Sequence, residues 1–316
     1  MHHKDVLIVG GGPAGAACAW QLRRHGLDPL ILDKAAFPRQ KTCAGWVTPA
    51  LFQLLEITPE DYPFGLTKFT SFQISVKGIK FRLPTRQYAI RRWEFDHWLL
   101  QYSGSAFESH HVKEVTLSGD QYIVDGQYSS KVIVGAGGTH CPIRKAFFSL
   151  TRPGKAQTLI LAKEEEFLYH AHDQRCHLWF FEDGLPGYAW YVPKATGFLN
   201  VGIGGSAAGL KTKGATLNHH WEMLVNKLAE LGLVSGHQFH PSGYSYRLRH
   251  KGSPKQEGRA YLVGDSIGLA TIDMGEGIVP AIQSGILAAN AIASGSDYDI
   301  NSIPRFSLPS LLRLRK

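Results

Sequence analysis

A glycine-rich turn near the start of the chain, GGGPAG, constrains the fold more than any other feature. It follows the apolar segment VLIV and precedes AGAACAWQLRRHG, after which comes a second apolar segment, PLILD. The order strand, turn, helix, strand over residues 5–33 predicts a βαβ unit, which takes about 30 residues. The N-terminal part of the chain is therefore expected to form an α/β domain.

The glycines of this turn have the spacing of a dinucleotide-binding fingerprint, Gly10-x-Gly12-x-x-Gly15. The first glycine allows a tight turn, the second lets the backbone approach a pyrophosphate, and the third lets helix and strand pack closely. The helix N-terminus supplies donors for the anion, and a carboxylate at the end of the next strand can bind a ribose. This pattern predicts the first group of cofactor-binding residues: Gly10, Gly12, Pro13, Ala14, Gly15, Asp33 and Lys34.

A second glycine-rich region near the C-terminus points to the same cofactor. Gly264 and Asp265 end the strand-like YLVGD, and Gly275-Glu276-Gly277 leads into the helix-like GIVPAIQSGILAANAIAS. A carboxylate at a strand end can bind a ribityl or ribose hydroxyl, and a helix N-terminus can stabilise the negative charge of a reduced flavin. Arg92, which opens a predicted helix, either meets this cofactor or is a surface arginine. These residues alone leave both NAD(P) and FAD open.

The net charge of +8, from 34 Lys and Arg against 26 Asp and Glu, does not indicate nucleic-acid binding, because no dense basic stripe or known module is present. The basic residues gather only in the tail, residues 300–316, which holds Arg305, Arg313, Arg315 and Lys316 and no acid. That tail is either frayed or in contact with an anionic membrane surface.

The cysteines and histidines predict neither disulfides nor a metal site. The four cysteines are far apart and form no CxxC pair. The pairs His110-His111 and His219-His220 hold adjacent residues, which point in different directions. A reducing, cytoplasmic location is expected, because MHHKD runs straight into a strand and no apolar window reaches about 18 residues.

Strand-like alternation recurs at residues 66–90 and 157–205, between helical segments such as RWEFDHWLLQY and ATLNHHWEMLVNKLAELG. We predict an α/β, Rossmann-type cofactor domain interleaved with a β-sheet-rich substrate domain. The cofactor domain is assigned residues 1–66, 86–150 and 256–299, and the substrate domain residues 67–85 and 151–255. The run Glu164-Glu165-Glu166 is interpreted as a solvated strand edge.

Five segments spread from residue 5 to about residue 294 carry a family resemblance: VLIVGGGPAGAACAWQL, FPRQKTCAGW, RRWEFDHWL, GYAWYVPK with NVGIGG, and YLVGDSIGLATIDMGEGIVPAIQSG. Together they resemble the geranylgeranyl reductase family of FAD-dependent oxidoreductases, within the p-hydroxybenzoate hydroxylase-like flavoproteins. The most specific segment, residues 187–193, is similar to the family element Tyr-x-Trp-x-Phe-Pro.

The resemblance implies non-covalently bound FAD and hydride transfer from reduced flavin to a double bond of an apolar substrate, isoprenoid-like or conjugated. Cys43 lies in the element where the family has Cys-Gly-Gly, next to the flavin, and is the candidate catalytic residue. The resemblance implies further FAD contacts at Arg39, Arg92, Gly137, Gly264, Asp265, Gly275, Gly277 and Ile278. It implies substrate contacts at Tyr188, Trp190 and Pro193.

Three departures from the family pattern keep alternatives open. Ala44 replaces the first glycine of Cys-Gly-Gly, and Val192 replaces the Phe before the proline. Gly137 stands where many relatives have Asp. The identity of the reductant is therefore left open between NAD(P)H and another electron donor. A flavin monooxygenase or halogenase is the second hypothesis, and a non-catalytic flavin- or lipid-binding protein the third. Without the resemblance, Cys43 is interpreted as a buried small hydrophobe, and Tyr188 and Trp190 as core.

Overall fold

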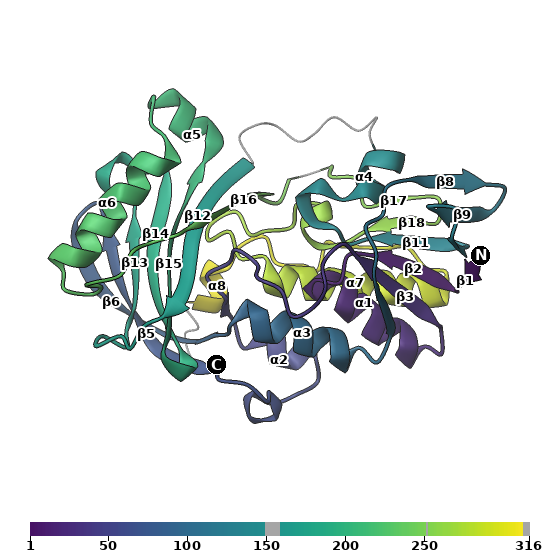
Figure 1. The fold of residues 1–316 in the computed structure, drawn as a ribbon, viewed down its shortest axis with the longest axis horizontal. Helices are drawn as coiled ribbons and strands as arrows, with labels where there is room; N and C mark the ends of the chain where they lie inside the picture. Colours follow the sequence, from purple (N-terminus) through teal and green to yellow (C-terminus); the bar gives the residue numbers. More distant parts are fainter. Residues whose placement is uncertain (149–158, 251, 312–316) are drawn as a thin grey trace. The chain divides into compact units, whose positions relative to one another are not determined.

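The computed structural model describes residues 1–148, 159–250 and 252–311 of the chain (Figure 1). The chain divides into two compact units. The first unit comprises Met1–Arg39, Trp93–Gly154 and Arg247–Ser307, and the second comprises Gln40–Arg92, Lys155–Tyr246 and Leu308–Lys316. Each unit is built from separate stretches of sequence, as the interleaved arrangement predicted from the strand and helix patterns requires.

The first unit is an α/β domain around a six-stranded sheet in the order β17-β18-β11-β2-β3-β7. All neighbouring strands from β18 to β7 are parallel, and β17 is antiparallel. The strands are β2 (Val6–Val9), β3 (Pro29–Asp33), β7 (Ala106–Ser109), β11 (Val132–Gly135), β17 (Gln256–Glu257) and β18 (Ala260–Leu262). The predicted βαβ unit is confirmed, with α1 (Pro13–Arg24) as its helix.

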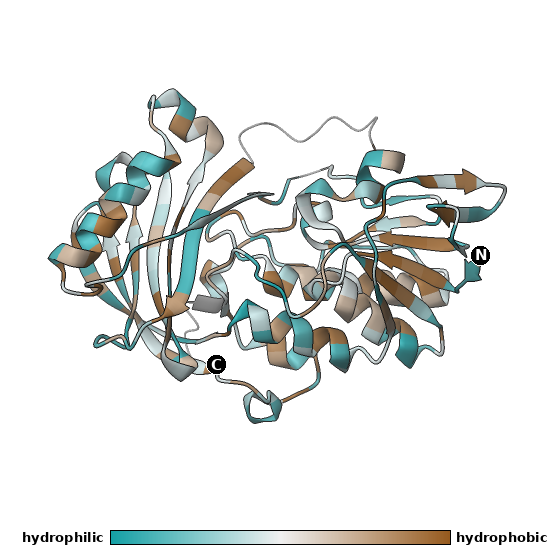
Figure 2. Cartoon of the chain, viewed as in Figure 1, coloured by the Kyte–Doolittle hydropathy of each residue, from teal (hydrophilic) through white to brown (hydrophobic). Residues whose placement is uncertain are grey.

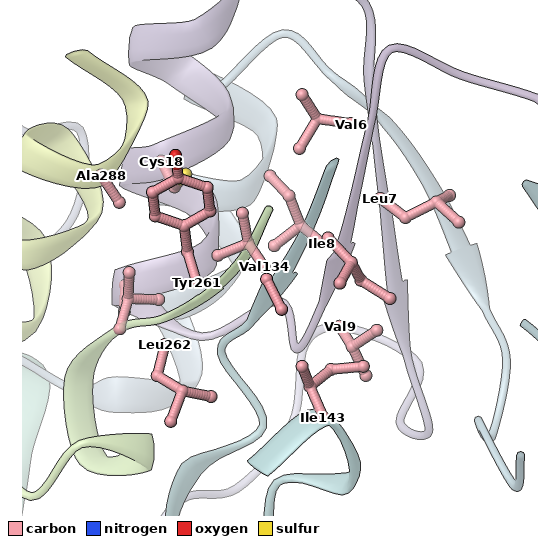
Figure 3. Packing of buried hydrophobic residues seen from close by; sticks show 14 of the residues in the cluster. Val6, Leu7, Ile8, Val9, Cys18, Val134, Ile143, Tyr261, Leu262 and Ala288 are labelled. Atoms are coloured by element: carbon pink, nitrogen blue, oxygen red, sulfur yellow. The ribbon is translucent and has the colours of Figure 1, made fainter. Parts of the chain in front are cut away.

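The core of the first unit lies between this sheet and its helices. All four residues of β2 are buried, as expected of a parallel strand covered on both faces. In Figure 3, side chains of β2, β11 and β18 gather with Cys18 of α1 and Ala288 of α7 (Ile278–Ser294). Helices α1 and α7 are in close backbone contact at Gly285. A Cβ at this position would lie 2.2 Å from the carbonyl oxygen of Ala14, so there is no room for a side chain.

A smaller four-stranded sheet in the first unit has the order β1-β10-β9-β8. Its antiparallel strands are β8 (Val115–Ser118), β9 (Gln121–Val124) and β10 (Tyr128–Ser130), and β1 (His2–His3) adds a parallel strand. The other elements of this unit are α3, which begins at Arg92 (Arg92–Tyr102), α4 (Pro142–Phe147), and the 3-10 turns η2 (Gly138–His140) and η6 (Gly264–Ser266).

The second unit is built on an eight-stranded sheet in the order β16-β12-β15-β14-β13-β5-β6-β4. The strands are β4 (Trp46–Val47), β5 (Thr67–Val76), β6 (Ile79–Ala89), β12 (Leu159–Leu168), β13 (Cys176–Phe180), β14 (Gly187–Lys194), β15 (Phe198–Ser206) and β16 (Ser242–Arg247). Its helices are α2 (Ala50–Leu54), α5 (Ala207–Thr212), α6 (Leu217–Glu230) and α8 (Leu308–Leu311), with 3-10 turns η1 (Pro59–Asp61), η4 (Glu182–Gly184) and η5 (Ala195–Gly197).

The two faces of this sheet differ. Helix α6 covers the face that carries Tyr191, Val201 and Ile203, and its own Trp221, Leu224 and Leu228 complete that core (Figures 1 and 2). Because strand residues alternate between faces, their neighbours Trp190 and Gly202 lie on the opposite face, which we call the Trp190 face. Strand pairing adds Glu164 beside Gly202, and Leu178 and Ile74 beyond Trp190.

The interpretation of Glu164-Glu165-Glu166 as a solvated strand edge is wrong. Strand β12 lies between β15 and β16 and is not an edge strand, and Glu164 is only 4% exposed. The three glutamates alternate between the two faces of the sheet, so neighbouring ones have different hydrogen-bond partners. Glu164 is hydrogen-bonded to Asn200, and Glu165 to His237.

The boundaries between the two units fall at different residues from the domain boundaries that we predicted. Residues 40–66, which we predicted with the cofactor domain, are grouped with the second unit. Strand β4 explains this grouping, because Trp46 and Val47 pair with Ala89 and Tyr88 of β6 and so extend the large sheet.

Candidate cofactor and substrate sites

The glycine turn after β2 has a geometry that only glycine permits at two positions. Gly10 has φ of +118°, and a Cβ there would lie 2.4 Å from the carbonyl carbon of Ala136 and 2.7 Å from the nitrogen of Gly137. A Cβ at Gly15 would lie 1.9 Å from the oxygen of Gly10. The turn is therefore pressed against the end of β11, where Gly137 follows.

The start of α1 is left open to an anion. Gly12 is the N-cap and Pro13 the first helical residue, and no side chain of the described residues caps this end, so its first N–H groups remain available as donors. The guanidinium group of Arg39 lies close to this end of the helix. Its Nη2 is 3.4 Å from the position that a Cβ of Gly12 would occupy. Arg39 is held there by Asp96, 3.3 Å away, and by the ring of Phe37.

Asp33 lies at the end of β3, as predicted, and its carboxylate braces the glycine turn. Its Oδ2 accepts the Gly11 N–H at 2.7 Å, and Oδ1 accepts the Ala35 N–H at 2.9 Å. Each carboxylate oxygen can accept further hydrogen bonds, so Asp33 can also bind a hydroxyl beside the turn. Lys34 is exposed.

The C-terminal group of predicted residues converges on the same end of the sheet. Gly264 has φ of +60°, and a Cβ there would lie 2.9 Å from the Cβ of Ala14, so η6 lies against the start of α1. Asp265 Oδ1 is 3.6 Å from where a Cβ of Gly277 would be. Gly275 also has positive φ, and Ile278 is buried. Apart from Arg92, which is buried and grouped with the second unit, the predicted cofactor-binding residues all belong to the first unit.

Glu276 is a buried acid that sequence reasoning did not single out. Its Oε2 accepts a hydrogen bond from Ser307 at 2.9 Å, and its N–H donates to Thr271 Oγ1. Its Oε1 is buried without a hydrogen-bond partner among the described residues. Burial raises the pKa of the Glu276 carboxyl to about 7. The sequence signal was the position itself, two residues before the start of α7.

These residues fit the ADP half of a dinucleotide. The turn gives close backbone approach, the open start of α1 and Arg39 suit a pyrophosphate, and Asp33 suits a ribose. In contrast, no group of three or more His, Cys, Asp or Glu within the described ranges could hold a metal ion.

In the second unit, aromatic side chains form a row on the Trp190 face. Phe180 stacks on Tyr188 with ring centroids 5.0 Å apart, and Tyr188 lies 5.7 Å from Trp190. Gly202 makes room for this row, because a Cβ there would lie 2.3 Å from the indole of Trp190. Pro193 pairs with Leu199, which belongs to the α6 face. The structure therefore brings Tyr188 and Trp190 together but does not place Pro193 with them.

Cys43 differs from the other cysteines because it is half-buried, whereas Cys18, Cys141 and Cys176 are buried. The Gly45 N–H donates to its sulfur at 3.4 Å. Its own N–H donates to Glu164 Oε1 at 2.6 Å. Burial raises the pKa of the Glu164 carboxyl, while the hydrogen bonds from Asn200 and Cys43 and the charge of Lys194 oppose that rise. The sequence does not identify Glu164 as a site residue. Only the pairing of β12 with β15 shows that Glu164 lies beside Gly202, on the Trp190 face.

Comparison with known proteins supports the cofactor domain first. Residues 8–40 match the family model described as an NAD(P)-binding Rossmann-like domain. This range contains the glycine turn, α1, Asp33 and Arg39. The described residues contain no helix that is long and apolar enough to cross a membrane.

Sequence relatives are named as reductases. Digeranylgeranylglycerophospholipid reductase 1 of Methanopyrus kandleri is 27% identical over 72% of this chain, and the match spans 64% of that relative, less than two thirds of its length. Menaquinone reductase of Mycobacterium tuberculosis is 26% identical over 92% of this chain and 76% of its own length. Geranylgeranyl diphosphate reductase of Rhodobacter capsulatus is 25% identical over 94% of this chain and 78% of its own length.

Solved structures share the fold. A geranylgeranyl bacteriochlorophyll reductase-like protein of Thermoplasma acidophilum superposes with a TM-score of 0.80 and 20% identity, covering 93% of this chain and 79% of that one. The flavin-dependent brominase Bmp2 superposes with a TM-score of 0.72 and 19% identity, covering 94% and 81%.

The Rossmann-type unit with its open glycine turn, interleaved with a large β-sheet unit, has the p-hydroxybenzoate hydroxylase-like fold of these solved structures. The relatives that are named as reductases support an FAD-dependent oxidoreductase of this fold. Within that class, the chain is similar to relatives that are named as digeranylgeranylglycerophospholipid and geranylgeranyl diphosphate reductases. The resemblance stated from the sequence is thereby confirmed.

Proposed function

We propose that the protein transfers hydride from reduced FAD to a double bond of an apolar substrate, isoprenoid-like or conjugated. The observation that carries this proposal is the aromatic row on the Trp190 face, which leads toward the Cys43 loop. Trp190 Nε1 donates to Asn200 Oδ1 at 2.7 Å, and Asn200 Nδ2 lies 3.4 Å from the Cys43 oxygen. Aromatic rings give a long apolar substrate contact area beside a potential proton donor.

The relatives support an apolar substrate of this class. Two of them are named for geranylgeranyl groups, which are isoprenoid chains with several double bonds. The chain itself replaces the family Phe with Val192 before Pro193. We therefore propose the class of substrate without a particular isoprenoid length.

The first unit would hold FAD. The glycine turn, α1 and Arg39 would bind the pyrophosphate, and Asp33 the ribose. Further along the cofactor, Arg92 and Asp265 would bind the ribityl chain. Gly275, Gly277 and Ile278, at the start of α7, would lie at the isoalloxazine ring, where the helix N-terminus stabilises negative charge. FAD, when bound and reduced, supplies the hydride.

Saturating a carbon–carbon double bond also takes one proton, which we assign to the Cys43 thiol. A thiol can deliver a proton to the second carbon and recover it from water. Tyr188 and Trp190 would orient the apolar chain, so that one double bond is presented to both groups. Gly137 replaces the family Asp near the cofactor turn, so we assign no particular reductant, and NADH, NADPH and other donors are to be tested.

An anaerobic titration of the purified protein tests this function. We expect a yellow protein that contains FAD and is reduced by NADH, NADPH or dithionite, and that then saturates geranylgeranyl diphosphate, seen by mass spectrometry as two added hydrogens per double bond. A colourless protein that cannot be reconstituted with FAD would refute the proposal. A product formed only with oxygen, or only with oxygen and halide, would support the monooxygenase or halogenase instead. A yellow protein that no reductant reduces would support a binding protein.

We also propose contact with an anionic lipid surface, which is where an apolar substrate would be found. The basis is the β5–β6 hairpin, where Ile79 is 72% exposed and Phe81 47% exposed. The exposed Lys77, Lys80 and Arg82 flank them, as expected of a segment that meets anionic headgroups. Of the basic tail, Arg305 is exposed, whereas Arg313, Arg315 and Lys316 lie outside the described residues.

A further inference from the structure

The loop that carries Cys43 is held by a buried carboxylate. Glu164, in the middle of β12, is only 4% exposed. Its Oε1 accepts the Cys43 N–H at 2.6 Å, and its Oε2 accepts Asn200 Nδ2 at 2.6 Å. Both oxygens of Glu164 are therefore used as acceptors, one for the Cys43 loop and one for β15.

The direction of these hydrogen bonds is fixed by groups that can only donate. The Trp190 indole is a donor only, and it faces Asn200 Oδ1 at 2.7 Å. The Asn200 amide must then turn its Nδ2 toward Glu164. The Cys43 N–H is likewise a donor only. Both oxygens of Glu164 therefore act as acceptors, which a carboxyl group provides and an amide does not.

The other end of the loop is held by a buried cation. Gly45 has φ of +65°, and a Cβ there would lie 2.2 Å from the Ile90 oxygen and 2.3 Å from Lys194 Nζ. The Ile90 N–H donates to the Gly45 oxygen at 2.8 Å, and Lys194 Nζ donates to the Ile90 oxygen at 2.5 Å. Residues 43–45 are thus fixed at both ends, by Glu164 and by the Lys194–Ile90 pair.

We propose that Glu164 is a positioning residue for Cys43, and that Trp190 and Asn200 set its hydrogen-bonding direction. Trp190 then has two roles, because its ring lines the aromatic row and its N–H orients the group that holds the Cys43 loop. This inference rests on the proposed function for the use made of Cys43. The geometric relationship between Glu164 and Cys43 can be measured without that reaction.

Glu164→Gln breaks the network in a defined way. A Gln offers one acceptor and one donor, so one of the two donors that face it meets an N–H instead of an oxygen. Asn200 cannot turn over to correct this, because its Nδ2 would then face the Trp190 N–H. The double variant Glu164→Gln/Asn200→Asp restores an acceptor for each of these donors and gives up only the long 3.4 Å contact from Asn200 Nδ2 to the Cys43 oxygen. The new carboxylate at position 200 accepts from the Trp190 indole and from the new amide at position 164, which keeps its oxygen for the Cys43 N–H.

The readout is the rate at which a thiol reagent labels the native, purified holoprotein. Cys43 is half-buried and the other three cysteines are buried, so the fast phase reports on Cys43, with Cys43→Ala as the blank. We expect roughly tenfold faster labelling in Glu164→Gln, because a buried donor without an acceptor loosens the loop. The double variant should return to within about twofold of the wild type. Glu222→Gln, an exposed glutamate of α6, is the matched control and should label like the wild type.

In the reductase assay, Glu164→Gln should lower kcat and leave KM nearly unchanged, and the double variant should recover kcat. Unchanged labelling in Glu164→Gln, or a double variant that remains as reactive as the single one, overturns the proposal. If Glu164→Gln does not fold, a folded double variant with wild-type labelling supports the proposal, and an unfolded one overturns it. A wild type that is inactive on prenyl substrates but shows this labelling pattern refutes the proposed function and leaves the positioning role of Glu164 standing.

Discussion

Gly202 lies directly against the Trp190 indole: a Cβ at position 202 would be 2.3 Å from the ring carbon Cζ2 and 2.7 Å from the Cβ of Glu164. The two residues are paired across β14 and β15, on the face of the sheet opposite α6. The absence of a side chain at 202 therefore lets the indole reach Asn200 and lets Glu164 reach Cys43. One glycine supports both the aromatic row and the loop of the candidate catalytic residue.

Gly202→Ala should consequently disturb the substrate site and the Cys43 loop together. We expect a loss of stability of about 1–3 kcal/mol from overpacking, a higher KM for the apolar substrate, and faster thiol labelling of Cys43. Urea unfolding, steady-state kinetics and labelling measure these effects. Gly243→Ala, on the exposed edge strand β16, is the control, because a Cβ there meets only the Ala162 oxygen at 3.8 Å. Equal behaviour of the two variants would contradict the role given to Gly202.

The candidate cofactor site of the first unit could be predicted from sequence because its signals are local. Gly10, Gly12 and Gly15 lie within one turn, and Asp33 follows at the end of the next strand. The candidate substrate site of the second unit could be predicted only in part. Tyr188 and Trp190 are two apart in one strand, which indicates a shared face, but what that face meets depends on pairing with β15.

Glu164 shows why the rest was not predictable. Three consecutive glutamates suggest a charged edge, and only the strand order reveals that β12 is interior. Its partners Cys43 and Asn200 are 121 and 36 residues away in the chain. Pro193 illustrates the reverse case, since the family motif grouped it with Tyr188 and Trp190 although alternation places it on the α6 face.

Gly15→Ala tests the cofactor turn. A Cβ at this position would lie 1.9 Å from the Gly10 oxygen, so the turn and α1 must move apart and the donors at the start of α1 lose their place. We expect FAD affinity to fall by roughly a hundredfold, about 3 kcal/mol, measured by flavin fluorescence titration of protein stripped of cofactor. Gly243→Ala again serves as the control. Wild-type affinity in Gly15→Ala would show that FAD does not rest on this turn.

Glu276 should make the stability of the protein fall as the pH rises. Burial raises the pKa of its carboxyl from 4.5 to about 7 in the folded protein, so the folded state holds the proton over a range in which the unfolded state has lost it. The linkage relation then gives a decrease in unfolding free energy between about pH 4.5 and pH 7, of about 3 kcal/mol in total. Urea unfolding of the holoprotein at about pH 5 and about pH 7.5 measures this loss.

Glu276→Gln should remove most of that difference, because Gln stays neutral and its oxygen can still accept from Ser307. The variant should therefore be more stable than the wild type at the higher pH and similar to it at the lower one. Glu230→Gln, an exposed residue at the end of α6, should leave the pH dependence as it is. An unchanged slope in Glu276→Gln would mean that another group carries the pH dependence.

The β5–β6 hairpin provides the test of membrane contact. Phe81 pairs with Ile74, and Ile74 with Leu178, which in turn pairs with Trp190, so these residues share the Trp190 face. The buried apolar residues of this face thus continue outward to the exposed Ile79 and Phe81, which we expect to enter the bilayer. Ile79→Ser/Phe81→Ser should reduce co-flotation with phosphatidylglycerol vesicles several-fold. The same change should leave thermal stability within about 0.5 kcal/mol, as is usual for exposed positions.

Salt separates the two contributions to this binding. Lys77→Gln/Lys80→Gln should weaken flotation at low ionic strength and have little effect at high ionic strength, because headgroup attraction is screened within about a Debye length. The apolar variant should stay weak under both conditions. Lys211→Gln/Lys213→Gln, in and just after α5 and likewise exposed, removes the same charge elsewhere on the second unit. If that control weakens flotation as much as the hairpin variants do, binding follows net charge, and the hairpin is not the contact surface.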